Sequence, residues 1–142
     1  MSVVEEARTW LGTPYLHQGT HKGLGCDCLG LVRGVWRETV GREPGFVPTY
    51  TPDWSEPGGQ EQLWSAAHLW LDDATAKPWS AGQVVLFRMR HGAVAKHLGI
   101  LTGAEPDLKF IHAYSGHGVI ESPLSTPWRR KVVARFSFPT GD

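Results

Sequence analysis

The chain has 142 residues, of which 41% are apolar and 20% charged, and its formal net charge is zero. These values are ordinary for one folded domain, here taken as residues 1–142, and a chain without basic excess is not expected to bind nucleic acid. No stretch approaches the roughly 18 consecutive apolar residues of a membrane helix, so no membrane partner is expected either. The N-terminus carries acids where a signal peptide needs bases, which predicts synthesis in the cytoplasm without a signal peptide.

Hydrophobic periodicity predicts the elements in chain order. Residues 2–11 are predicted to form a helix that Gly12 ends, and a glycine-rich loop over 19–25 leads to a second helix over 27–40. A proline- and glycine-rich loop over 42–59 precedes a third helix over 60–71. Strands are predicted at 83–89, 97–102, 109–114, 118–121 and 131–138. Helices first and strands afterwards indicate an α+β fold with an antiparallel sheet.

The start of the second helix is the most informative segment of the chain. Asp27 is a good N-cap, so Cys28 falls in the first helical turn. Unpaired N–H groups and the positive end of the helix dipole favour a thiolate there, and the thiolate is the nucleophilic form. The sequence therefore predicts a nucleophilic cysteine with a lowered pKa.

Two downstream histidines could complete a catalytic group with Cys28. His97 opens one predicted strand and His112 lies in the next, so adjacent strands can place the two side by side. Nucleophilic catalysis by cysteine needs a base and a third polar group that orients the base. We expect His97 to transfer protons and His112 to orient His97.

The two cysteines also admit other interpretations. A zinc site could use Cys26, Cys28, His97 and His112, but the spacing is C-x-C and no second paired ligand motif is present. A Cys26–Cys28 disulfide would close a very short, strained loop. We therefore expect no metal, and we place Cys26 in the loop as a small residue, with a redox role left open.

Several segments, in order along residues 11–113, resemble the NlpC-type cell-wall cysteine peptidases of the papain-like clan. They are Leu11-Gly12-Thr13-Pro14-Tyr15, Cys26-Asp27-Cys28-Leu29-Gly30-Leu31-Val32, Gly82-Gln83-Val84-Val85-Leu86-Phe87, His97-Leu98-Gly99-Ile100 and Phe110-Ile111-His112-Ala113. The nucleophile segment resembles most the phage-tail branch, including gene transfer agents. Two positions depart from the family pattern: Leu29 replaces a common Ser and Gln83 an Asp.

The resemblance implies a papain-like fold, with N-terminal helices packed on a central antiparallel β-sheet and the nucleophile at a helix N-terminus. It implies a cysteine peptidase without cofactor that cleaves a peptidoglycan stem peptide, typically between D-Glu and a diamino acid. It also implies that Tyr15 and Asp27 bind substrate, Asp27 through a free amine of the stem. An amidase or acyltransferase of the same clan, and a tail-tip structural protein with a vestigial site, remain alternatives.

The segment 42–77 is longer than a minimal family member needs and is interpreted as an insertion for substrate or docking. Four of the seven tryptophans lie in or beside it: Trp54, Trp64, Trp70 and Trp79. Packing is the simpler interpretation of these residues, and binding of sugar rings or a partner protein is the alternative. Because the inferred substrate lies outside the cytoplasm, we expect a phage tail or tail-like particle to deliver the protein to the cell wall of the target cell.

Overall fold

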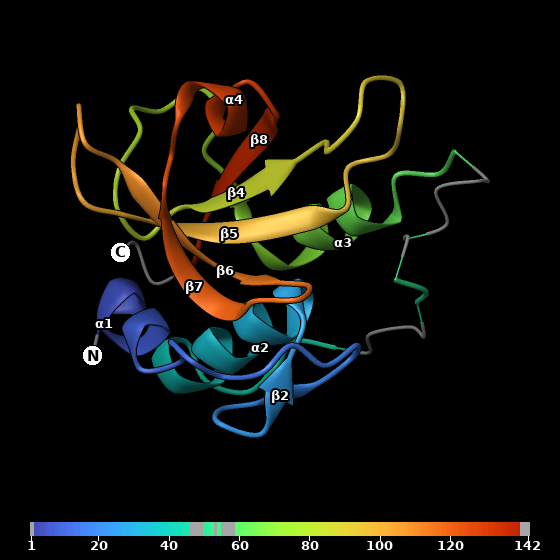
Figure 1. Ribbon diagram of the computed structural model, residues 1–142, viewed down its shortest axis with the longest axis vertical. Coiled ribbons are helices and arrows are strands. Elements are labelled where there is room, and N and C mark those ends of the chain that lie inside the picture. Colours follow the sequence, from blue (N-terminus) through green and yellow to red (C-terminus); the bar gives the residue numbers. More distant parts are fainter. Residues whose placement is uncertain (1, 46–49, 53, 55–58, 140–142) are drawn as a thin grey trace.

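The computed structural model describes residues 2–45, 50–52, 54 and 59–139 (Figure 1). The helices are α1 Val3–Arg8, α2 Cys28–Thr39, α3 Gln62–Trp70 and α4 Thr126–Arg129. The strands are β1 Thr20–His21, β2 Gly25–Cys26, β3 Asp72–Asp73, β4 Val84–Phe87, β5 His97–Thr102, β6 Lys109–Tyr114, β7 Gly118–Pro123 and β8 Val132–Ser137. Within the described ranges, no helix is long and apolar enough to cross a bilayer.

A six-stranded sheet forms the centre of the molecule, in the order β3-β8-β4-β5-β6-β7. Every neighbouring pair in it is antiparallel. Figure 1 shows α1 and α2 lying together beside β6 and β7, with α3 near β5. The predicted α+β fold, with helices on an antiparallel sheet, is confirmed.

The two faces of the sheet bury different sets of side chains, because successive residues of a strand point to opposite sides. Leu98 and Ile100 face the main core, which α1, α2 and α3 complete. Phe87 and Phe110 face a smaller core against Trp128 of α4. The ring contacts of His97 and His112 with Trp128 place both histidines on this second face.

Local sequence explains how the first two helices begin and meet. Ser2 and Glu5 form a capping box at the start of α1, and the Asp27 side chain caps α2. Gly34 lets α2 approach the turn that follows α1, since a Cβ there would lie 2.0 Å from the Trp10 ring. This contact holds α2, and with it the Cys28 position, against the segment that follows α1.

The predicted boundaries need several corrections. The first helix ends at Arg8 and not at residue 11, and part of the glycine-rich stretch 19–25 is the antiparallel hairpin β1–β2. Cys26 consequently lies in a strand, where it pairs with Thr20 and bridges Tyr15, and not in a loop. Two-residue strands such as β1 and β3 are too short to give a period, and α4 spans only one turn.

The insertion predicted over 42–77 lies partly outside the described residues, at 46–49, 53 and 55–58. Its described part contains α3 and β3, and α3 packs Leu63 and Ala67 into the main core. This helix is therefore part of the folded body of the domain.

Candidate active site

A pocket of about 560 Å³ lies at the start of α2 and contains most of the predicted site. Tyr15, Asp27, Cys28 and His97 all line it. His112, the fifth predicted residue, is fully buried directly behind His97. The fold thus brings together residues that lie up to 97 positions apart in the sequence.

The two histidines form a hydrogen-bonded pair between neighbouring strands. Nε2 of His97 lies 2.7 Å from Nδ1 of His112, and Nε2 of His112 lies 3.0 Å from the Ser122 hydroxyl. The β6–β7 register pairs His112 with Ile120, so Ser122 is its diagonal neighbour on the same face. Sequence reasoning missed Ser122, which no local motif marks.

Burial around Cys28 opposes the activation that the helix start predicts. The thiol is 6% exposed and donates to the Lys96 carbonyl oxygen at 3.9 Å. Burial, followed by the nearby Asp27 charge, raises the pKa of Cys28 to about 12, although the Leu98 and Leu29 N–H groups act to lower it. The prediction of a lowered Cys28 pKa is therefore wrong for the unliganded protein.

The same burial keeps the histidines neutral. It lowers the pKa of His97 to about 3, with the neighbouring His112 as a second cause. It also lowers the pKa of His112 to about 4, helped by His117. At neutral pH the unliganded site therefore holds a thiol and two neutral imidazoles.

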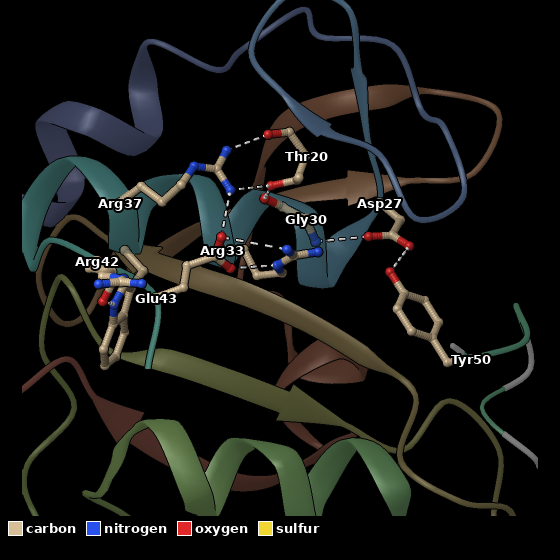
Figure 2. Close-up of polar contacts among 9 residues, drawn as sticks. Thr20, Asp27, Gly30, Arg33, Arg37, Arg42, Glu43 and Tyr50 are labelled. Carbon is tan, nitrogen blue, oxygen red and sulfur yellow. Dashed lines mark hydrogen bonds and ion pairs between the residues drawn. The ribbon is translucent and has the colours of Figure 1, made fainter. Parts of the chain in front are cut away.

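Asp27 is buried and uses its carboxylate within the protein (Figure 2). One oxygen accepts the Gly30 N–H at 2.8 Å, which caps α2. The other accepts the Gln18 N–H at 2.7 Å and the Tyr50 hydroxyl. Both oxygens have partners, so the structure gives Asp27 a cap and an anchoring role, and its binding of a substrate amine stays a prediction.

Tyr15 presents a neutral phenol to the pocket. Burial is the main cause that raises the pKa of Tyr15 to about 12, with the Asp27 charge also contributing, so its hydroxyl keeps a proton to donate. Its backbone forms a parallel bridge with Cys26. Substrate binding by Tyr15 stays a prediction that this position permits.

A pair of aromatic residues, of which only Trp54 was considered for binding from the sequence, forms another wall of the pocket. The Tyr50 and Trp54 rings stack with centroids 4.1 Å apart and an interplanar angle of 8°. Both residues line the pocket, and Trp54 adopts φ 53°, which is rare outside glycine. They come from a proline- and glycine-rich segment without periodicity, so only their aromatic character could have suggested a role.

The other predicted tryptophans are engaged in packing. The Trp70 ring lies 5.5 Å from the ring of Trp36, and Trp64 packs against the main core. The guanidinium groups of Arg129 and Arg135 each lie 4.3 Å from the centroid of the Trp79 ring. The packing interpretation accounts for these contacts.

The cysteines and histidines do not assemble into a metal site. Within the described part of the chain, no group of three or more His, Cys, Asp or Glu side chains is arranged to hold a metal ion. Cys26 and Cys28 are both free thiols, and burial raises the pKa of Cys26 to about 12.

Comparison with solved structures supports the fold. The NlpC/p60 domain of the peptidoglycan hydrolase SagA superposes with a TM-score of 0.62 at 22% identity, over 96% of this chain and 97% of that one. An NlpC/P60 family protein from Bacillus cereus gives a TM-score of 0.65 at 18% identity, over 96% of this chain and 39% of that one.

Comparison of sequences extends the likeness to curated proteins. The chain is 31% identical over 131 residues to the gamma-DL-glutamyl hydrolase of Bacillus subtilis, covering 92% of this chain and 27% of that protein. It is 30% identical over 129 residues to the murein DD-endopeptidase/murein LD-carboxypeptidase MepS of Escherichia coli, covering 91% of this chain and 57% of that protein. The chain thus spans less than two thirds of either relative. The NlpC/P60 family matches residues 12–137, and the chain belongs to this family.

Proposed function

We propose that this protein is a cysteine peptidase that hydrolyses peptide bonds of peptidoglycan. The observation that carries the proposal is the pocket that Cys28 and His97 both line, with Nε2 of His97 lying 2.7 Å from Nδ1 of His112. A nucleophile, a base and a group that orients the base are the elements of acyl transfer through cysteine. The proposal is supported by the names of two relatives, a gamma-DL-glutamyl hydrolase and a murein DD-endopeptidase/murein LD-carboxypeptidase.

The neutral resting state determines the order of proton transfers. Because the Cys28 pKa is high and the His97 pKa is low, the thiol gives its proton to His97 as its sulfur attacks the carbonyl carbon. His97 uses Nδ1, since Nε2 is bonded to His112. The imidazolium then protonates the leaving amine, which departs and leaves a thioester.

Water completes the cycle. His97 removes a proton from the water that attacks the thioester and returns a proton to the Cys28 sulfur, which restores the thiol and frees the acid product. The Cys28 backbone N–H, at the first residue of α2, is suited to bind the carbonyl oxygen as negative charge develops there.

The proposed bond is the one between D-Glu and the diamino acid of a stem peptide. The name of the Bacillus subtilis relative, a gamma-DL-glutamyl hydrolase, supports this choice, whereas the Escherichia coli relative is named for DD and LD bonds. Incubation with purified peptidoglycan, followed by mass spectrometry of the fragments, decides between them. A new N-terminal diamino acid supports the D-Glu bond, and separation of cross-linked stems supports a DD bond.

Single substitutions test the assigned roles in the same assay. Cys28→Ala and His97→Ala are each expected to abolish fragment release while the protein stays folded, because the two act as one unit. Cys26→Ser is expected to retain most activity. Activity that survives in Cys28→Ala and disappears in Cys26→Ser would overturn the nucleophile assignment.

We further propose that the protein is a component of a phage tail or gene transfer agent and opens the cell wall as DNA enters. The proposal rests on the likeness of the segment Cys26-Asp27-Cys28-Leu29-Gly30-Leu31-Val32 to that branch of the family. Antibody detection in purified particles is the test. Protein at stoichiometric level in particles supports it, whereas protein found only in the lysate excludes a tail component and leaves the chemistry untouched.

A further inference from the structure

Tyr50 is held beside the catalytic pocket by contacts on several sides. It is 7% exposed, and its ring stacks on the ring of Trp54 and meets the His17 ring edge-on, with centroids 5.2 Å apart. Its backbone carbonyl oxygen accepts a hydrogen bond from Nε2 of Gln18 at 2.9 Å and lies 3.1 Å from Nε2 of His17. The position of the Tyr50 hydroxyl is therefore fixed by the protein itself.

The Tyr50 hydroxyl meets the carboxylate of Asp27, the residue that directly precedes Cys28 (Figure 2). Tyr50, Asp27 and Cys28 all line the catalytic pocket. The hydroxyl donates to Oδ2 of Asp27, and Nδ1 of His17 lies 3.7 Å from the same oxygen. This oxygen also accepts the Gln18 N–H, whereas the other oxygen of the carboxylate caps α2. The oxygen of Asp27 that does not cap the helix is therefore already surrounded by groups of the protein.

The chemistry of this contact shows which ligand group it excludes. A buried carboxylate beside a nucleophile attracts an ammonium group strongly, because charges interact more strongly where water is excluded. An ammonium group that reached Oδ2 of Asp27 would have to displace the Tyr50 hydroxyl, which would then be left buried without a partner. Burial, followed by the bond to Asp27, raises the pKa of Tyr50, so the hydroxyl keeps the proton that it donates. An acylated nitrogen carries no charge and needs no such displacement.

We propose that Tyr50 is a specificity-determining residue: by donating to Asp27, it makes the pocket select peptides whose amino end is acylated over peptides whose amino end is a free ammonium group. A stem peptide still joined to its glycan chain through an amide is of the acylated kind, whereas a stem peptide released from the glycan is of the free kind. The inference rests on the proposed peptidase function for the substrate and adds a preference that the catalytic residues do not supply. It assigns Asp27 a role different from the amine binding that the family resemblance implies.

The first test compares hydrolysis of two synthetic peptides, L-Ala-γ-D-Glu-L-Lys with a free amino end and the same peptide with an acetylated amino end. We expect kcat/KM of the acetylated peptide to exceed that of the free peptide about tenfold, since burying an ammonium group without a partner is costly. Tyr50→Phe keeps the stacked ring and removes the hydroxyl, so Asp27 can bind the ammonium group and the ratio should shift about tenfold toward the free peptide. An unchanged ratio in Tyr50→Phe, or a preference of the unsubstituted protein for the free peptide, would overturn the proposal.

Two control variants show whether the shift comes from the contact between Tyr50 and Asp27. Tyr114→Phe removes the hydroxyl of another tyrosine that lines the pocket, and it should leave the ratio unchanged. Asp27→Asn, combined with Tyr50→Phe, keeps an oxygen to cap α2 but removes the charge, so it should cancel the shift. A shift of the same size in Tyr114→Phe, or one that persists with Asp27→Asn, would contradict the assignment.

The second test separates this preference from the proposed chemistry. Binding of the same two peptides is measured by calorimetry with the Cys28→Ala protein and with the protein that carries both Cys28→Ala and Tyr50→Phe. Tighter binding of the acetylated peptide by the first protein, and a gain for the free peptide in the second, support the role of Tyr50 even if neither peptide is cleaved. Equal binding of the two peptides by both proteins would overturn it, even if hydrolysis of peptidoglycan is confirmed.

Discussion

The helix N-terminus and burial have opposite effects on the pKa of the Cys28 thiol, and the larger effect determines whether the thiol is charged. A helix N-terminus typically stabilises a nearby negative charge by about 0.3–1 kcal/mol. Burial of an ionisable group can shift its pKa by up to about 3–5 units, each worth about 1.4 kcal/mol. Because Cys28 is buried beside the Asp27 carboxylate, burial outweighs the helix start and the thiol is neutral.

Alkylation of the thiols tests this balance directly. Only the thiolate reacts, so the rate for Cys28 with iodoacetamide should rise roughly tenfold per pH unit from pH 7 to 9. Cys26, whose pKa is also about 12 and which is 0% exposed, should react only on unfolding. Mass spectrometry of the Cys26→Ser protein gives the Cys28 rate alone. A rate already maximal at pH 6 would show that Cys28 is a thiolate after all.

Ser122 can stabilise the tautomer of His112 that the proposed mechanism requires. For Nδ1 of His97 to accept a proton, its Nε2 must carry hydrogen and donate to Nδ1 of His112. His112 then carries hydrogen on Nε2, and the Ser122 hydroxyl oxygen accepts it at 3.0 Å. Ser122 is thus a positioning residue that acts through His112.

Substitution of Ser122 should reduce the rate without removing it. Ser122→Ala leaves Nε2 of His112 without its partner, and we expect kcat to fall about tenfold with KM unchanged. Ser122→Thr keeps the hydroxyl and should restore most of the rate, whereas Ser122→Asp should raise the pKa of His112 and move the acid limb of the pH–rate profile upward. If Thr and Ala behave alike, the hydroxyl has no such role.

The predictable part of the site follows from local sequence. Cys28, His97 and His112 stand at recognisable positions of a helix or strand, so their elements and their approximate proximity could be inferred. Ser122, Tyr50 and Trp54 reach the site only through strand register or through an irregular segment. The direction in which the Cys28 pKa shifts could be determined only from the three-dimensional structure, because burial depends on what packs around the thiol.

At the scale of elements, the hairpin β1–β2 and helix α2 are joined by close polar contacts (Figure 2). Thr20 donates its hydroxyl to the Gly30 carbonyl at 2.8 Å, and Arg37 donates to both oxygens of Thr20. Glu43 forms ion pairs with Arg33 and Arg37, which lie one turn apart on α2. The Thr20 contacts hold the hairpin β1–β2 against α2, whose first turn carries Cys28.

At the junction between the hairpin and α2, position 30 has no room for a side chain larger than that of glycine. A Cβ there would lie 1.7 Å from the Gly19 carbonyl oxygen, far inside contact distance, so Gly30→Ala must separate hairpin and helix. We expect a loss of about 1–3 kcal/mol in the free energy of unfolding, measured with urea, together with lower activity. Gly45→Ala, where a Cβ meets nothing within 4 Å, is the control. An unchanged urea midpoint for Gly30→Ala would contradict this account.

Periodicity predicted the longer elements, whereas the two-residue strands and the one-turn helix α4 were not predicted. Strands β5 and β6 and helix α2 lie within one residue of their expected limits, because each spans enough residues for its pattern of apolar residues to be recognised. The hairpin β1–β2 depends on the Tyr15 bridge and on contacts with α2, so no local pattern marks it. The hairpin β1–β2, which directly precedes Cys28 in the chain, was therefore not predictable from the sequence pattern.

At the scale of the whole molecule, the buried ionisable groups of the site should limit stability on both sides of neutral pH. Folding lowers the pKa of His97 from 6.5 to about 3 and that of His112 to about 4. The unfolded chain therefore binds more protons than the folded one below pH 6.5, which favours unfolding. Conversely, folding raises the pKa of Cys26 and Cys28 from 9 to about 12, so the unfolded chain loses protons first above pH 9.

Stability should consequently be greatest between about pH 6.5 and 9 and should fall outside this window. From pH 6.5 down to 5, before most carboxylates titrate, each buried histidine lowers the free energy of unfolding by up to roughly 1.4 kcal/mol per pH unit. Urea unfolding at half-unit steps from pH 4.5 to 10 measures the curve. His112→Gln removes one titrating group, so its acid-side slope should be shallower. A curve that is flat from pH 6.5 to 5, or unchanged in His112→Gln, would mean that these histidines keep their ordinary pKa in the folded protein and are more open to water than their packing against Trp128 implies.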